Sequence, residues 1–146
     1  MLSSSYWCRF VNADGASSYP SGTYEIPLVL QDRSFTEDGS LFYPSVSPVP
    51  TAPVPSVIPI FAADTIVVNG KTWPYLEIEP RKYRFRLLNG ANSRFYELSL
   101  DGPAESDGVF PVIGSDGGLI GEVVDKEPLL LSPADRYDGV VDCSQY

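Results

Sequence analysis

The stretch DTIVVNGKTWPYLEIEPRKYRFRLLN (64–89) decides the fold expected for this chain. Its first part, DTIVV, is separated from KTWPYLEIE by Asn69-Gly70. Asn-Gly between two strand-like runs is the strongest short hairpin signal, because both central residues of such a turn need positive φ. Residues 81–89 then alternate, with apolar side chains on one face and arginines on the other. The stretch predicts a hairpin over residues 64–79, followed by a half-buried strand.

Strand patterns continue outward from this centre. Residues 24–33 place Ile26, Leu28 and Leu30 on one face, and Pro27 indicates a sheet edge or a strand start. Turn signals lie at TEDGS (36–40) and at GSDGG (114–118), where we expect a sharp turn that needs glycine. The further strands are expected at residues 94–100, 109–113, 128–132 and 137–142. Seven or eight short strands with regular turns predict an all-β sandwich or Greek-key barrel.

Two segments are predicted to lack regular secondary structure. Residues 1–23 form a turn-rich lead-in, so we expect the folded domain to comprise residues 24–146. Residues 44–59 hold six prolines and predict a stiff, extended loop over the barrel, although a proline-rich recognition segment is an alternative.

Composition narrows the function. The chain has 146 residues and a net charge of −9, and such a surface repels nucleic acid. No apolar run is long enough to span a bilayer, and the first residues do not resemble a signal peptide. The chain has no histidine, the commonest transition-metal ligand and general base. This excludes Ser-His-Asp catalysis and a blue-copper centre, which needs two histidines and a cysteine.

The remaining polar residues favour structural roles. The carboxylates are expected to make local hydrogen bonds rather than a hydrolytic pair; they are Asp32, Asp64, Asp116, Asp135, Asp138 and Asp142. A basic group in the middle of the chain is expected to pair with carboxylates rather than to bind an anion; it comprises Arg81, Lys82, Arg84, Arg86 and Arg94. Arg136 is expected to pair with its neighbours Asp135 and Asp138 in the same way.

The roles of four further side chains stay open. Trp73 is expected in the core or in an interdomain contact, and Trp7 could be a ligand platform. Cys8 and Cys143 lie near opposite ends, so a bridge is possible, but unpaired thiols are the simpler reading.

Four stretches of the sequence carry a family resemblance. YEIPLVLQDRSFTEDGSLFYPS (24–45) resembles the opening of the second domain of bacterial spore-coat-type laccases and bilirubin oxidases. Residues 64–102 resemble the centre of that domain, through a VNG hairpin, then W-P, then PRKYRFR. IGSDGG (113–118) and LSPADRYDGVVD (131–142) complete the match, which covers nearly all of residues 20–146.

The resemblance to multicopper oxidases implies a cupredoxin-like Greek-key domain. In three-domain members, histidines of the first and third domains hold copper, and the middle domain bridges them without binding any. No copper ligand can be carried over to this chain, and it is not expected to be an enzyme by itself. The intact parent would oxidise phenols or tetrapyrroles and reduce dioxygen to water. Such parents are often spore-coat, periplasmic or secreted proteins.

The resemblance also implies a candidate site and partners. The segment before the VNG hairpin lies near the substrate pocket in similar laccases, so Phe61, Ala62, Ala63 and Asp64 are expected at its rim. The partners would be domains one and three, and the lone chain is expected to self-associate through exposed apolar patches. The N-terminal YWCRFVNADG lacks the His-x-His motifs expected upstream and is interpreted as a truncated remnant or an artefact of gene assembly.

Two other functions remain as alternatives. A stand-alone, copper-free scaffold or binding protein fits the acidic, proline-decorated surface. An independent carboxylate hydrolase would require the aspartates to converge in one cleft.

Overall fold

The fold is described by a computed structural model that covers residues 19–44, 51, 53–55, 58, 60–101 and 108–144. Trp7, Cys8, most of the lead-in and much of the proline-rich loop, including Pro48, Pro50 and Pro59, lie outside the described residues. Within these residues, ten strands follow the 3-10 turn η2 (Gly22–Tyr24). They are β1 (Glu25–Phe35), β2 (Leu41–Phe42), β3 (Thr65–Val68), β4 (Lys71–Thr72), β5 (Lys82–Asn89), β6 (Tyr96–Leu98), β7 (Phe110–Ser115), β8 (Gly118–Lys126), β9 (Leu129–Leu131) and β10 (Arg136–Asp142).

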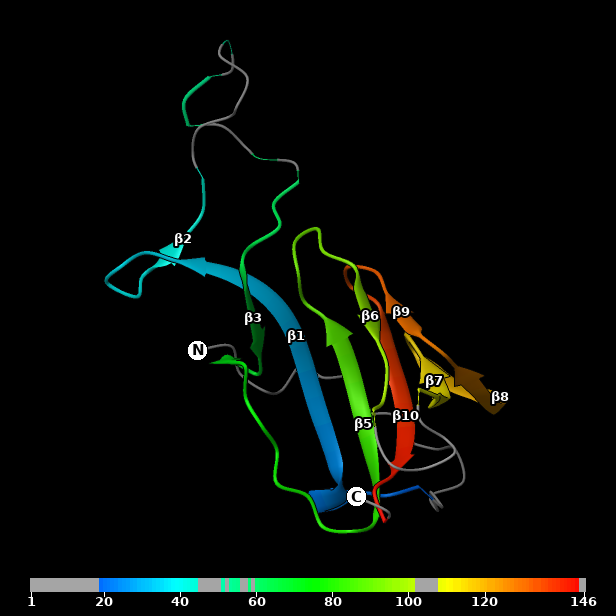
Figure 1. The fold of residues 1–146 in the computed structure, drawn as a ribbon. Coiled ribbons are helices and arrows are strands. Elements are labelled where there is room, and N and C mark those ends of the chain that lie inside the picture. Colours follow the sequence, from blue (N-terminus) through cyan, green and yellow to red (C-terminus); the bar gives the residue numbers. More distant parts are fainter. Residues whose placement is uncertain are drawn as a thin grey trace.

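Most of these strands form one large sheet, in the order β4-β3-β1-β5-β10-β7-β8, with β2 paired to β1 (Figure 1). β1 pairs in parallel with β5 and antiparallel with β3, so the chain crosses over between them. β3 pairs with β1 only from Leu30 onward, and Pro27 therefore lies in the early part of β1, where β3 is not paired. This confirms the strand-start position expected for this proline.

The core lies between this sheet and a second, two-stranded sheet of β6 and β9. The second sheet contributes Tyr96, Leu129 and Leu131, which pack with Leu87 of β5 and Val141 of β10. The predicted apolar faces of β1 and β5 point into this core. The architecture is thus the all-β sandwich that the strand pattern predicted.

The opposite face of the large sheet carries a row of ion pairs. Arg84 Nε lies 2.9 Å from Asp138 Oδ1, and both side chains are almost fully buried. Glu25 contacts Arg84 and forms an ion pair with Arg86. The hydrogen bonds that Arg84 donates to Asp138 stabilise the charged form of Arg84 and raise the pKa of the guanidinium.

Glycine permits one close approach beside this row. A Cβ at Gly139 of β10 would overlap the ring of Phe110, so only glycine fits there.

The hairpin signal is confirmed, but the length of its second strand is not. Asn69 and Gly70 have φ values of 50° and 82°, as this turn requires. The return strand was expected to continue through residue 79, yet β4 ends at Thr72. The backbone beyond it has no partner strand within the described residues, and strand propensity alone does not make a ladder.

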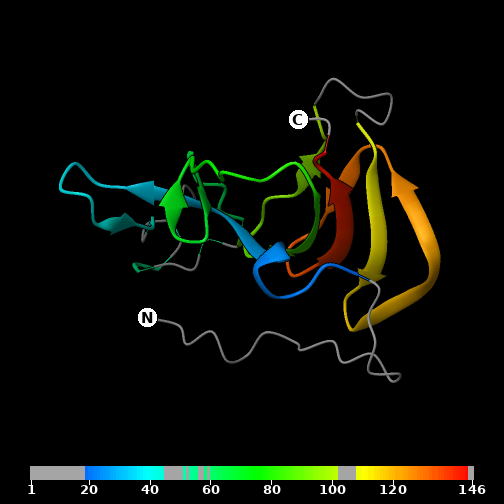
Figure 2. The ribbon, with the colours of Figure 1, turned by 90° about the horizontal axis from the view of Figure 1, so that it is seen from below.

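Strand β8 was not predicted. It carries Gly121 and interspersed charges, and exposed residues occur on both of its faces, so it lacks the alternation that identifies a half-buried strand. Its pairing with β7 shifts register: Val124 pairs with Val112 and Leu119 with Gly114, which leaves residues 120–123 opposite Ile113 alone. The middle of β8 accordingly bows away from β7 (Figure 2).

The turn between β7 and β8 differs from the prediction in which residue has positive φ. The sequence GSDGG does form the sharp turn, but the positive φ, 51°, belongs to Asp116.

Within the described residues, no helix has the length and apolarity needed to cross a membrane.

Candidate functional site

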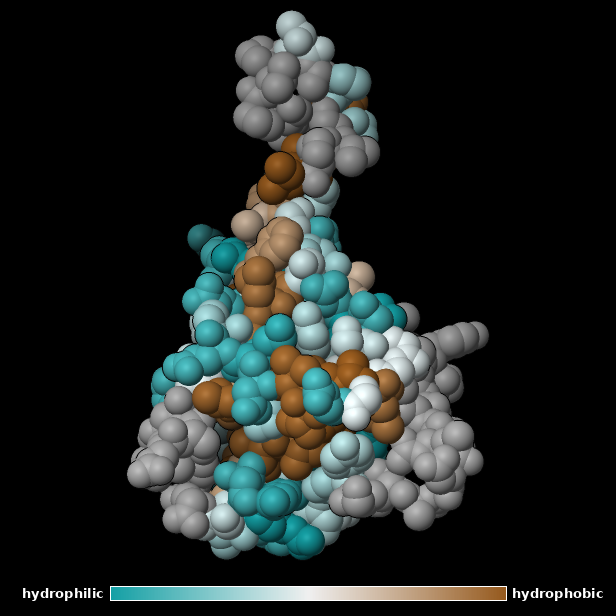
Figure 3. Space-filling view, turned by 90° about the vertical axis from the view of Figure 1, so that its right-hand side faces the viewer, coloured by the Kyte–Doolittle hydropathy of each residue, from teal (hydrophilic) through white to brown (hydrophobic). Residues whose placement is uncertain are grey.

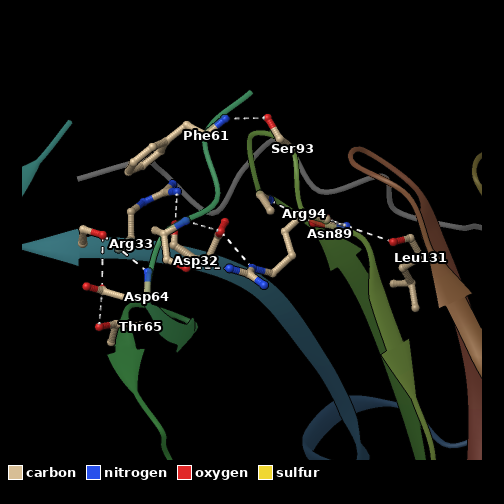
Figure 4. A network of polar contacts seen from close by, with 12 residues as sticks. Asp32, Arg33, Phe61, Asp64, Thr65, Asn89, Ser93, Arg94 and Leu131 are labelled. Atoms are coloured by element: carbon tan, nitrogen blue, oxygen red, sulfur yellow. Dashed lines mark hydrogen bonds and ion pairs between the residues drawn. The ribbon is translucent and has the colours of Figure 1, made fainter. Parts of the chain in front are cut away.

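The candidate site is the segment of residues 61–64, which leads directly into β3. It lies between β1 and the loop that follows β5 (Figure 4). Ala63 is buried, Phe61 is half-buried, and Ala62 and Asp64 are exposed. The structure therefore brings the four predicted rim residues together as one short ledge, with only part of it facing solvent.

A buried carboxylate fixes this ledge from the side of β1. Asp32 is 2% exposed, and its Oδ2 accepts a hydrogen bond of 2.7 Å from the backbone N–H of Ala63. The adjacent Asp64 accepts hydrogen bonds from the hydroxyls of Ser34 and Thr65. A charge buried this deeply requires an opposite charge or several donors.

Arg94 supplies that charge and also binds the backbone of Ala63. Its Nε lies 3.0 Å from Asp32 Oδ2, and its Nη2 donates to the carbonyl oxygen of Ala63 at 2.6 Å. Asp32 and Arg94 thus bind both polar groups of the Ala63 backbone. Charge-assisted hydrogen bonds of this kind are stronger than neutral ones.

Two further side chains secure the loop that carries Arg94. Asn89, 1% exposed, donates to the carbonyl oxygens of Arg94 and Leu131 and accepts from the N–H of Ala91. The Ser93 hydroxyl accepts a hydrogen bond of 3.1 Å from the N–H of Phe61. We call Asp32, Asn89, Ser93 and Arg94 the clamp residues.

One buried polar group beside the clamp has no partner. The Tyr96 hydroxyl makes no hydrogen bond within the part of the chain that the structure describes. Burial raises the pKa of Tyr96, and the negative charge of Asp32 raises it further.

The clamp holds backbone rather than performing chemistry. Its carboxylate is already bound by Ala63 and Arg94, and the chain contains no histidine to act as a general base near neutral pH. Among the described residues, no group of three His, Cys, Asp or Glu side chains is placed to hold a metal ion. The arrangement can present Ala62 and Phe61 rigidly to a neighbouring molecule or domain.

The predicted basic group does not form one site. Arg81 pairs with Glu79, Lys82 with Asp142, and the arginines of β5 with Glu25 and Asp138, while Arg94 joins the clamp. The expectation that these residues pair with carboxylates is confirmed.

Arg136 pairs differently from the prediction. It lies 3.6 Å from Asp116 rather than pairing with Asp135 or Asp138. Asp138 is engaged by Arg84, and Asp135 accepts the N–H of Ser132 within its own turn.

The sequence carries one signal for the clamp that the predictions did not use, namely the position of Asp32. Asp32 continues the series Ile26, Leu28 and Leu30 on the core-facing side of β1. A carboxylate in an apolar series is expected to be buried with a cationic partner. The identity of that partner, 62 residues along the chain, could not be read from spacing.

Two exposed apolar surfaces lie away from the clamp. The first is a segment that follows β4, residues 73–78, which we call the strap; its exposed members are Trp73, Tyr75, Leu76 and Ile78. The second surrounds β8 and is visible as an apolar area in Figure 3; it comprises Leu119, Ile120, Val123, Val124 and Leu130. Trp73 is 69% exposed, so it does not lie in the core of this domain, and the alternative of an interdomain contact stays a prediction.

Known proteins resemble this chain closely. A laccase of Bacillus subtilis is 53% identical over 129 residues, which cover 87% of this chain and 24% of the laccase. A bilirubin oxidase of Albifimbria verrucaria is 36% identical over 141 residues, or 92% of this chain and 22% of that enzyme. No family model matches the chain.

A solved structure agrees with these sequence relatives. The McoA multicopper oxidase of Aquifex aeolicus is 35% identical and aligns with a TM-score of 0.69 over 86% of this chain and 25% of that protein. The fold is therefore cupredoxin-like, as expected. The chain spans about a quarter of the length of the curated relatives it matches, and it belongs to the multicopper oxidase family.

Proposed function

We propose that residues 24–146 serve as the non-catalytic middle domain of a laccase-like multicopper oxidase, where they bridge two copper-bearing domains. The parent enzyme would oxidise phenols or tetrapyrroles and pass the electrons to dioxygen. The single observation that carries the proposal is the pair of apolar surfaces at opposite ends of the large sheet. The strap adjoins β4, and the second surface surrounds β8, at the two ends of the strand order.

These surfaces support a bridging role because large contiguous apolar patches mark interaction sites. A domain with a single neighbour needs one such surface, whereas a bridge needs two. When the chain is alone, the apolar surface around β8 is expected to drive self-association, which light scattering at micromolar concentrations can detect.

Copper, which the family name implies, does not fit this chain. Copper sites in proteins use imidazole and thiolate ligands. The chain has no histidine, and Cys143 is buried in the core, where burial raises the pKa of its thiol. The redox chemistry would therefore belong to the neighbouring domains.

The ledge of residues 61–64 extends the proposal to the substrate. In the assembled enzyme, Phe61, Ala62, Ala63 and Asp64 would form part of the rim of the substrate pocket. Ala62 is the member best placed to contact a phenol, because its side chain is exposed while the backbone beside it is held by the clamp. An Ala62→Phe change in an assembled enzyme is expected to alter KM more than kcat; unchanged KM would refute this role.

A domain replacement tests the bridging function. The matching quarter of the Bacillus subtilis laccase is replaced by residues 24–146 of this chain. We expect the chimera to fold as one protein, bind copper and oxidise phenols, whereas the same host without the segment should do neither. A soluble chimera that fails to load copper would contradict the proposal and favour a stand-alone scaffold.

A further inference from the structure

The strap combines a strand-like sequence with a backbone that, within the described residues, is unpaired beyond Trp73. The sequence KTWPYLEIE predicts a strand, but the ladder ends where the N–H of Trp73 donates to the carbonyl oxygen of Ile66. The next hydrogen bond is made by the N–H of Glu79, which donates to the Tyr83 hydroxyl at 2.9 Å. Within the described residues, the backbone between these points, residues 74–78, makes none.

The side chains of the strap are equally uncovered. Tyr75 is 87% exposed, and Trp73, Leu76 and Ile78 are all exposed. In Figure 1 the strap descends apart from the strands, from β4 to the start of β5. Four large apolar side chains in six residues exceed what isolated surface positions normally show.

The strap also begins in an unfavourable conformation. Trp73 has a φ of 45°, which is an outlier for a bulky residue. Proline follows it, and the residue before a proline is normally extended. Such backbone strain persists only where other interactions offset it. Within the described residues the indole is largely exposed and offers little such compensation, so a contact with a neighbouring segment is a natural source.

We propose that the strap is a strand-addition site that pairs with an extended segment of a neighbouring domain, rich in apolar residues and carrying lysine or arginine. The inference rests on the proposed bridging function for the origin of that segment. Main-chain hydrogen bonds would satisfy residues 74–78, and the apolar side chains would pack on the added strand, as in other strand-addition complexes.

Charge selects this occupant over a second copy of the chain. Glu77 lies between the apolar residues Leu76 and Ile78 of the strap, and the whole chain has a net charge of −9. Two straps paired with each other would bring their Glu77 carboxylates close together, and like charges across a strand pair are destabilising. A basic partner removes this repulsion. The relatives are about four times as long as this chain, so their remaining length can supply the partner.

Hydrogen exchange of the strap amides tests the inference directly. In the lone chain, Tyr75, Leu76, Glu77 and Ile78 should exchange as fast as unstructured peptide. In the copper-loaded chimera, the exchange rate of the same amides should fall by about 100-fold or more, as for strands that open only by local unfolding. Equal exchange in both proteins would overturn the inference while leaving the bridging function intact.

Other exchange outcomes are also decisive. Protection that appears in the lone chain and grows with its concentration would identify a second copy as the occupant and overturn the inference. A chimera that does not assemble would contradict the bridging function, and with it the source of the partner strand.

Paired variants separate the backbone and charge contributions. Leu76→Pro should leave the thermal unfolding of the lone chain unchanged, because the backbone there is unpaired, but should impair copper loading of the chimera several-fold. Glu77→Lys should also impair loading, whereas Glu37→Lys, at an exposed turn away from the strap, should not. Chimeras insensitive to both strap variants would overturn the inference.

Discussion

The two segments that flank the β3–β4 hairpin differ in almost every respect. Residues 61–64, before the hairpin, are held by a buried carboxylate, an arginine and the hydroxyl of Ser93. The strap, after the hairpin, is exposed and has no backbone partner at residues 74–78 within the described residues. The comparison shows that the domain secures the first segment with its own side chains, and the substitutions below test whether a neighbour completes the second.

The largest expected effect comes from breaking the clamp. Arg94→Ala should destabilise the lone chain by about 3 kcal/mol, because it leaves the buried Asp32 without its cation. Urea unfolding measures the loss. The matched control is Arg136→Ala, which removes an exposed pair with Asp116 and should cost less than about 1 kcal/mol. Equal losses for the two variants would show that the pair of Asp32 with Arg94 stabilises the chain no more than an exposed ion pair does.

Asn89→Ala should have the next largest effect. It removes a buried side chain that serves two carbonyl oxygens and one N–H, and it should cost about 2 kcal/mol. Hydrogen exchange should also accelerate at the Ala91 amide, which donates to the Asn89 side chain. A loss of stability without faster exchange there would place the effect elsewhere in the core.

Tyr96→Phe tests a buried hydroxyl that lies beside the clamp. The Tyr96 hydroxyl is buried without a partner in the described residues, so its removal should leave stability unchanged or raise it by up to about 1 kcal/mol. Thermal unfolding of the two proteins checks the sign. A clear loss of stability would mean that the hydroxyl is hydrogen-bonded to bound water.

The smallest effect on the lone chain is expected in the strap. Tyr75→Ser and Leu76→Ser remove exposed side chains and should change its stability by less than about 0.5 kcal/mol. The same substitutions should weaken the assembled chimera, while Leu41→Ser, equally exposed on β2, should affect neither protein. A large loss in the lone chain would show that the strap is part of its own core.

Local signals predicted much of this fold. Asn69-Gly70 located the central hairpin, and the alternation of β1 and β5 identified the faces that pack in the core. Two errors have physical causes: β4 is short because a strand requires a partner, and β8 lacks an apolar face to reveal it.

The candidate site was only partly predictable. The segment of residues 61–64 came from a family resemblance, whereas the residues that hold it depend on long-range contacts. The position of Asp32 in an apolar series indicates that its side chain is buried, but only the folded chain shows that Arg94 is its partner.

The division of labour between scaffold and redox domains is tested most directly by the copper content of the purified lone chain. The chain is dialysed against copper, passed over a chelating resin and examined for bound metal, a blue copper–thiolate absorbance and dioxygen consumption. The account predicts no tightly bound copper, no blue colour and no turnover, because the imidazole ligands of the family must come from other domains. One retained copper per chain that turns over dioxygen would contradict it.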